Sequence, residues 1–272
     1  MSDSCIYANT WQELKRTPRH DRRPEAEKIP SESDSDTDRS QSEVEIISAD
    51  VCPFAQRSRI VLLEKEVDFI LSEIDLKNKP DWFLRVSPYS KVPVLRYGET
   101  RIYESAIINE YLDEVFPKPP LMPSDPERRA EARIWIDFCD NRFTVTFYKL
   151  LLEQDKDKQN EYRNCMLDHL LFLETKMLSG TYGSGPYWMG KTFSLVDASF
   201  APFFERFVAL EHYRDVTIPP QHTRLKEWTT ALERRESVKK TSRSRDYFIA
   251  RYAPYADGTA EGITAKEMRE KT

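Results

Sequence analysis

Short apolar runs and helix-forming segments alternate over residues 44–116, and this alternation restricts the fold more than any other feature of the chain. Runs rich in Val, Ile and Leu predict strands at 44–48, 69–74, 92–95 and 101–103. The intervening and following segments predict helices at 53–66, 80–84 and 104–115. The resulting order, βαβ-α-ββα, predicts a mixed sheet with helices on both faces.

The rest of the chain shows only helical patterning, and a cluster of prolines separates it from the first half. The cluster consists of Pro117, Pro119, Pro120 and Pro123. It predicts that the preceding helix ends here and that a linker follows at 118–124. Beyond it, Asp125-Pro126 begins a helix, a second covers roughly 156–178, and a capping-box pattern at 194–197 precedes a third at 198–210. We therefore expect an α/β domain at 44–117 and an all-α domain at 125–256.

Both ends of the chain are polar. Residues 31–43 contain no apolar side chain, so they cannot bury enough surface to offset the entropy of ordering. We expect residues 1–43 to form a disordered leader and residues 257–272 to form a polar, frayed tail.

Composition excludes several classes of protein. The net charge of −5 argues against a general nucleic-acid binder. No apolar run approaches the roughly 18 residues that a membrane helix needs. Neither the four cysteines nor the four histidines have the tight spacing typical of a metal site. We expect a cytoplasmic protein that binds no metal, no membrane and no nucleic acid.

Cys52 lies directly before a predicted helix that begins with Pro53. Proline suits the first helical turn, which places Cys52 at the helix N-terminus, where free amides and the helix dipole favour an anion. The sequence thus predicts a thiol with a lowered pKa, and the thiolate is the nucleophilic form. A small buried cysteine is the alternative, since free cysteine is among the most buried residue types.

The order of the segments and several motifs resemble the cytosolic glutathione transferases, and the omega class in particular. The motifs are Cys52-Pro53-Phe54-Ala55, Leu76 to Phe83, Val92-Pro93-Val94-Leu95 and Ile102 to Ile107. The resemblance covers 44–126 closely and extends more loosely to about 250. It implies an N-terminal thioredoxin-like domain followed by an all-helical domain, glutathione as co-substrate, and a homodimer.

Glutathione needs a partner for its thiol, backbone pairing for its middle residue, and an anion site for its γ-glutamyl end. Cys52 supplies the first, and Val92 offers main-chain groups for the second. Ser105 and the amides after Glu104 supply the third as a helix N-terminus. The resemblance places Glu104 at the ligand's ammonium and Lys79 near its glycyl carboxylate, and it implies a cis Val92–Pro93 bond. Taken singly, these residues also fit helix capping and a solvated surface charge.

A cysteine at this position implies glutathione-dependent thiol transfer and dehydroascorbate reduction. Ala55 occupies the position at which a C-x-x-C motif has its second cysteine, so glutathione must resolve a mixed disulfide in a monothiol cycle. The partner would be a small electrophilic or disulfide substrate. The alternative is a non-catalytic binding or regulatory module, because fold does not fix function.

The pocket for the second substrate is expected between the two domains. Matching positions in the family nominate Phe54, Phe203, Arg206 and Tyr247, although core packing explains these aromatic residues equally well. A basic run near the C-terminus is more typical of a solvated face than of an anion site; it contains Arg234, Arg235, Lys239, Lys240, Arg243 and Arg245.

Overall fold

A four-stranded mixed sheet begins the described part of the chain, with the strands in the order β2-β1-β3-β4. The computed structural model describes residues 43–180 and 184–270, so the expected leader lies outside it except for Glu43. The strands are β1 (Val44–Ser48), β2 (Phe69–Glu73), β3 (Val94–Tyr97) and β4 (Thr100–Tyr103). β1 pairs with β2 in parallel and with β3 antiparallel, and β3 pairs antiparallel with β4.

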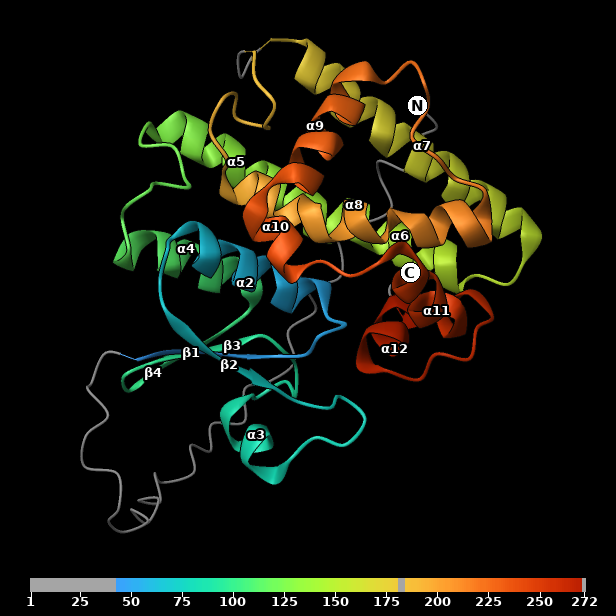
Figure 1. The fold of residues 1–272 in the computed structure, drawn as a ribbon. Coiled ribbons are helices and arrows are strands. Elements are labelled where there is room, and N and C mark those ends of the chain that lie inside the picture. Colours follow the sequence, from blue (N-terminus) through green and yellow to red (C-terminus); the bar gives the residue numbers. More distant parts are fainter. Residues whose placement is uncertain (1–42, 181–183, 271–272) are drawn as a thin grey trace, which may run out of the picture. The chain divides into compact units, whose positions relative to one another are not determined.

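Helices cover both faces of this sheet, as the sequence predicts (Figure 1). α2 (Pro53–Glu64) and α4 (Ser105–Val115) lie on one face, and the short α3 (Asp81–Val86) lies on the other. Side chains alternate between the faces of a strand, which explains why Ile46 and its neighbour Ile47 are both fully buried. Ile46 belongs to the large core shared with α2 and α4, whereas Ile47 packs with Phe83 of α3. The predicted βαβ-α-ββα order is confirmed.

The chain beyond the proline cluster is helical. Its elements are α5 (Pro126–Phe138), a π-helical turn (Cys139–Phe143), α6 (Thr144–Leu152), α7 (Lys156–Leu178), α8 (Leu195–Arg214), α9 (Thr223–Arg234), α10 (Glu236–Thr241), α11 (Arg245–Ala256) and α12 (Ile263–Glu270). α8 is the central helix and contacts α5, α6, α9 and α11 as well as α2 of the first domain. The two domains thus share one hydrophobic core.

The N-terminus of α8 has the predicted capping box. The Asp197 carboxylate accepts the amide and the hydroxyl of Ser194 at 2.8 and 2.6 Å. The same carboxylate also accepts a hydrogen bond from the indole N–H of Trp228 at 2.7 Å. Leu195, which follows Ser194 in the chain, donates its amide to the Leu121 carbonyl at 2.9 Å. The Leu195–Leu121 bond connects the interdomain linker to the start of α8.

The expected frayed tail is wrong for residues 263–270, which form α12. Ala265 and Met268, three residues apart on one face of this helix, are buried, and α12 packs against α6. The segment has too few apolar residues for its periodicity to stand out in the sequence. Among the described residues, no helix is both long and apolar enough to span a membrane.

Candidate active site at the start of α2

A cavity of about 370 Å³ lies where the β1–α2 turn, the segment before β3, the start of α4 and α12 meet. Its walls include every residue that the sequence analysis assigns to catalysis or glutathione binding, namely Cys52, Lys79, Val92, Glu104 and Ser105. A larger hollow of about 960 Å³ lies by α9, α10 and the end of α2, and it contains none of them. The smaller cavity is therefore the candidate site.

Cys52 is the N-cap residue of α2, and Pro53 is the first residue of the helix. The Cys52 amide donates to the Ala49 carbonyl at 2.9 Å, which closes the turn after β1. The half-buried thiol lies 3.7 Å from the Val92 carbonyl oxygen, which it contacts as a donor. The predicted position of this thiol at a helix start is thus found in the structure.

The direction of the Cys52 pKa differs from the sequence prediction. The amides of Ala55 and Phe54 lower the pKa of the thiol, as expected for a helix N-terminus, and so do two guanidinium groups. Burial is the larger effect, however, and it raises the pKa of Cys52 above its ordinary value. The sequence could not show this, because burial depends on the domain that packs over the turn.

Ser105, the first residue of α4, lies beside a buried arginine. Arg57 of α2 donates from Nε to the Ser105 hydroxyl at 2.8 Å. Its two terminal nitrogens donate to the Asp140 carboxylate at 2.6 and 3.2 Å. Because the Ser105 oxygen accepts from Arg57, its own O–H is free to point toward an anion at the start of α4.

Glu104 and Val92, two other residues of the site, have unusual backbone geometry. Glu104 has a φ of +67°, a conformation that costs a non-glycine residue energy and that clusters at functional sites. The Val92–Pro93 peptide bond is cis, as the family resemblance implies. Lys79 donates from Nζ to the Ser90 carbonyl at 2.7 Å, and partial burial lowers its pKa.

Of the four residues nominated for the second substrate, the cavity wall includes Phe54 but not the other three. Phe203 is fully buried in the shared core, where its ring lies 5.6 Å from that of Phe54. Arg206 is also buried, and the Tyr247 hydroxyl donates to the Asp50 carboxylate at 2.9 Å.

One wall of the cavity consists of residues that were not predicted from the sequence. α12 and the residues before it contribute Ile263, Glu267 and Met268, and α11 contributes Tyr255. Glu267 forms an ion pair of 2.6 Å with Lys91 of the segment before β3. Because α12 has few apolar residues, no clear pattern in the sequence marks this wall.

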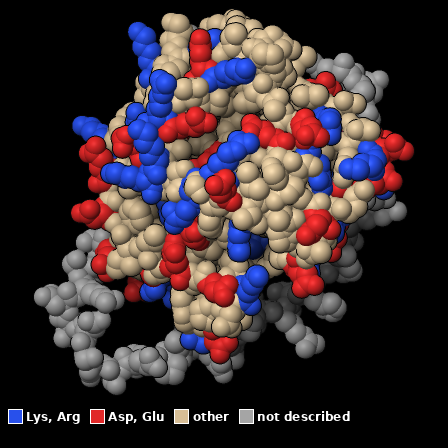
Figure 2. Space-filling model, turned by 45° about the vertical axis from the view of Figure 1, so that its right-hand side comes forward, with Lys and Arg blue, Asp and Glu red and all other residues tan. Residues whose placement is uncertain are grey.

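The basic run near the C-terminus is largely ion-paired. Arg235 binds Glu64, Lys239 binds Glu236, Arg243 binds Asp50, and Arg245 binds Glu211. Basic and acidic side chains lie among one another on the face shown in Figure 2. Within residues 43–180 and 184–270, no group of three His, Cys, Asp or Glu side chains is placed to hold a metal ion.

Comparison with known proteins follows the two-domain division. The family models described as "Glutathione S-transferase, N-terminal domain" and "Glutathione S-transferase, C-terminal domain" match residues 51–115 and 159–231. The rice (Oryza sativa subsp. japonica) protein named "Probable glutathione S-transferase DHAR1, cytosolic" is 35% identical over 205 residues, which are 75% of this chain and 89% of that protein.

Solved structures agree. Glutathione transferase Omega 3C from Trametes versicolor superposes with a TM-score of 0.69 and 32% identity, covering 74% of this chain and 90% of its own. The Tau class glutathione S-transferase MiGSTU from mango (Mangifera indica) gives a TM-score of 0.73 and 26% identity, covering 81% and 100%. This chain belongs to the glutathione S-transferase family.

Proposed function

We propose that this glutathione transferase is of the cysteine type and catalyses glutathione-dependent thiol transfer and dehydroascorbate reduction through Cys52. The observation that carries the proposal is the cavity that brings a thiol at a helix start together with the side chains of Lys79, Glu104 and Ser105 and the main chain at Val92. Its relatives are titled both omega and tau class, so the class is part of the proposal.

Each end of glutathione has a chemically suitable partner on the cavity wall. The γ-glutamyl carboxylate binds the first amides of α4 and the Ser105 hydroxyl, where the helix N-terminus favours an anion. Glu104 takes the ammonium group, and the main chain at Val92 pairs with the cysteinyl residue. Lys79 takes the glycyl carboxylate, for which it has to leave the Ser90 carbonyl.

The proposed reaction needs one protein thiol. The Cys52 thiolate attacks the glutathionyl sulfur of a mixed disulfide, the S–S bond breaks, and the substrate leaves as a thiolate that takes up a proton. A glutathione thiolate then attacks the Cys52–glutathione disulfide, which releases oxidised glutathione and regenerates Cys52. Cys139, the other free cysteine among the described residues, is fully buried and so is no candidate for resolving the disulfide.

For dehydroascorbate the cycle begins differently: the Cys52 thiolate adds to a carbonyl carbon, and a glutathione thiolate then attacks the Cys52 sulfur. The C–S bond breaks, ascorbate leaves with the electron pair, and the Cys52–glutathione disulfide forms, which a second glutathione resolves as before. Two glutathione molecules are oxidised to one disulfide, and the two electrons and two protons released convert dehydroascorbate to ascorbate. The name of the rice relative supports a cytosolic location, and we propose the cytoplasm, with a homodimer as the working assembly.

Mass spectrometry after exposure to oxidised glutathione tests this proposal. The tryptic peptide 40–57 contains Cys52 as its one cysteine, and it should gain one glutathionyl group. Cys52→Ala should lose thiol transfer and dehydroascorbate reduction, while Cys139→Ala, the matched control, should retain both. Full activity in Cys52→Ala would refute the mechanism.

The alternative of a non-catalytic module is decided by ligand binding. A ligand that binds only the folded state raises its thermal stability by mass action. If millimolar glutathione leaves the melting temperature unchanged, the binding-module interpretation stands and the enzyme proposal fails.

A further inference from the structure

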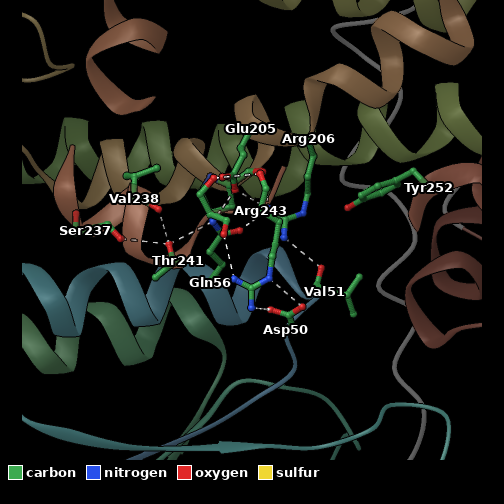
Figure 3. A network of polar contacts seen from close by, with 12 residues as sticks. Asp50, Val51, Gln56, Glu205, Arg206, Ser237, Val238, Thr241, Arg243 and Tyr252 are labelled. Carbon is green, nitrogen blue, oxygen red and sulfur yellow. Dashed lines mark hydrogen bonds and ion pairs between the residues drawn. The ribbon is translucent and has the colours of Figure 1, made fainter. Parts of the chain in front are cut away.

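The turn that carries Cys52 is held in place by side chains of the helical domain. Arg206 of α8 is only 1% exposed, and its Nη2 donates to the carbonyl of Val51, the residue before Cys52, at 3.2 Å. Its Nη1 donates to the Gln56 side-chain oxygen on the first turn of α2 and to the Pro202 carbonyl at 2.8 Å. One guanidinium group thus binds the chain on both sides of the thiol (Figure 3).

A second set of hydrogen bonds also connects the β1–α2 turn and the first turn of α2 to the helical domain. Gln56 donates to Glu205 at 2.7 Å and to the Thr241 hydroxyl of α10 at 3.3 Å. Asp50, two residues before Cys52, accepts from Arg243 and from the Tyr247 hydroxyl. Figure 3 shows Glu205, Thr241 and Arg243 of the helical domain beside Gln56 and Asp50 of the first domain.

Arg206 does not contact the space in which a substrate would bind. It lies outside the wall of the candidate cavity, and its guanidinium carbon lies 4.6 Å above the Phe248 ring. Any effect of Arg206 on the reaction therefore passes through the residues that it contacts, among them the turn that carries Cys52.

We propose that Arg206 is a positioning residue for Cys52: it fixes the turn that carries the thiol and keeps a buried positive charge near it. The proposal rests on the function proposed above, because it concerns the same nucleophile. It replaces a substrate-pocket role for Arg206 with a role behind the nucleophile.

Charged and titratable groups from several elements act on the Cys52 thiol. Arg57 of α2 and Arg206 of α8 both lower the pKa of Cys52, against the larger effect of burial. The phenols of Tyr252 and Tyr255 on α11 also interact with Cys52 electrostatically. Asp140 offsets the charge of Arg57 at 2.6 Å, whereas Glu205 lies 3.5 Å from Arg206 and receives its closer hydrogen bond from Gln56.

The cavity wall adds charges of both signs. Lys79 lines it from the segment before α3, Lys91 from the segment before β3, Glu104 from the start of α4, and Glu267 from α12. Because Lys91 and Glu267 pair with each other, Arg206 and Arg57 remain the cations that act on Cys52 directly.

The test measures the pH dependence of Cys52 alkylation by iodoacetamide in the full-length protein, read on the tryptic peptide 40–57. Arg206→Met removes charge and contacts, and we expect its midpoint to rise by roughly one pH unit, the smaller end of the effect of a nearby opposite charge. Arg206→Lys keeps a charge, but its single amine cannot reproduce the planar fork. Its midpoint should stay near that of the wild type, with kcat for thiol transfer lowered about tenfold by misplacement of the turn and KM for glutathione unchanged.

The matched control is Arg214→Met. Arg214 is a second buried arginine of α8, and it donates to the carbonyls of Leu150 and Leu151, away from the turn. This variant should lower the melting temperature and leave the alkylation midpoint of Cys52 unchanged.

The inference is overturned if Arg206→Met keeps the wild-type midpoint, or if Arg214→Met shifts it equally. Should Arg206→Met fail to fold, Arg206→Lys decides, because wild-type kcat in that variant refutes the positioning role. The alkylation midpoint needs no turnover. A failure of the proposed function, seen as activity in Cys52→Ala, is therefore distinguishable from a failure of this inference.

Discussion

A single serine shows how the site prepares for an anion. The Ser105 oxygen accepts from Arg57, and the charge of Arg57 is balanced by Asp140. The hydroxyl is therefore oriented as a donor without leaving a net positive charge unpaired behind it. An exposed cation alone would bind the γ-glutamyl carboxylate with less directional preference.

Ser105→Ala removes that donor and leaves the α4 amides in place. A hydrogen bond to a charged group contributes roughly 1.5–3 kcal/mol, so we expect the dissociation constant for glutathione to rise about tenfold or more. Isothermal titration calorimetry measures the change. Thr175→Ala, which removes an exposed hydroxyl on α7, is the control and should bind like the wild type. Equal affinity in Ser105→Ala would place the carboxylate elsewhere.

The raised pKa of Cys52 determines how the ligand-free enzyme responds to pH. A thiol whose pKa lies above the ordinary value of about 8.5 is mostly protonated at neutral pH. Alkylation of Cys52 should therefore be slow at pH 7 and should still be rising above pH 8.5. The folded state also loses stability as pH rises through this range, because the unfolded chain releases the proton more easily. A rate that is already maximal at pH 7 would mean that the helix amides outweigh burial.

At the scale of elements, α12 is the part of the site that was not predicted from the sequence. Its exposed face is polar, and its contacts with the cavity depend on the Lys91–Glu267 pair and on Met268. The residues assigned to glutathione all belong to the first domain, so we propose that α12 borders the space left for the second substrate.

Met268→Ala tests whether α12 contacts the second substrate and not glutathione. Removing a buried Met side chain from the wall enlarges the cavity and weakens packing. We expect KM for the second substrate to rise severalfold, with little change in KM for glutathione. Steady-state kinetics with each substrate varied in turn measures both values. Lys266→Ala on the exposed side of α12 is the control, and a change confined to glutathione would contradict the assignment.

The elements themselves were mostly predictable, for physical reasons. Predicted and observed bounds agree within a few residues for β1, α2 and α7. Pro53, the first residue of α2, and Asp155, the N-cap of α7, are residue types that favour a helix start, and β1 is a short apolar run. α8 extends from 195 to 214, beyond the predicted 198–210, since tertiary burial supports turns that local pattern does not mark.

At the scale of the whole molecule, the residues that the sequence assigns to glutathione line one cavity, whereas the side chains that support them were not predicted. Arg57 pairs with Asp140 across 83 positions, and Arg206 reaches Gln56 across 150. No local pattern encodes such contacts, because they exist only once the helical domain packs on α2. The same packing buries Phe203, for which core packing was one of two interpretations, and it raises the pKa of Cys52, which the sequence predicts to be lowered.

Two exposed apolar side chains bear on the proposed homodimer. Ile107 on α4 is 59% exposed and Ile134 on α5 is 63% exposed. Arg133, next to Ile134, forms an ion pair with Glu110, one turn after Ile107, so the two helices lie together at this surface. Apolar side chains left uncovered on neighbouring elements are typical of an interaction site.

The double variant Ile107→Glu/Ile134→Glu tests whether this surface joins two copies. In a two-fold dimer each substitution occurs on both subunits, so like charges would face one another across the interface and cost several kcal/mol. We expect the wild type to have twice the monomer mass in light scattering after gel filtration, and the variant to have the monomer mass with the same helical content. Leu171→Glu/Leu178→Glu, which charges exposed leucines on α7, is the matched control and should remain dimeric. A monomeric wild type would remove the homodimer from the proposal, and a dimeric α4–α5 variant would move the interface to another face.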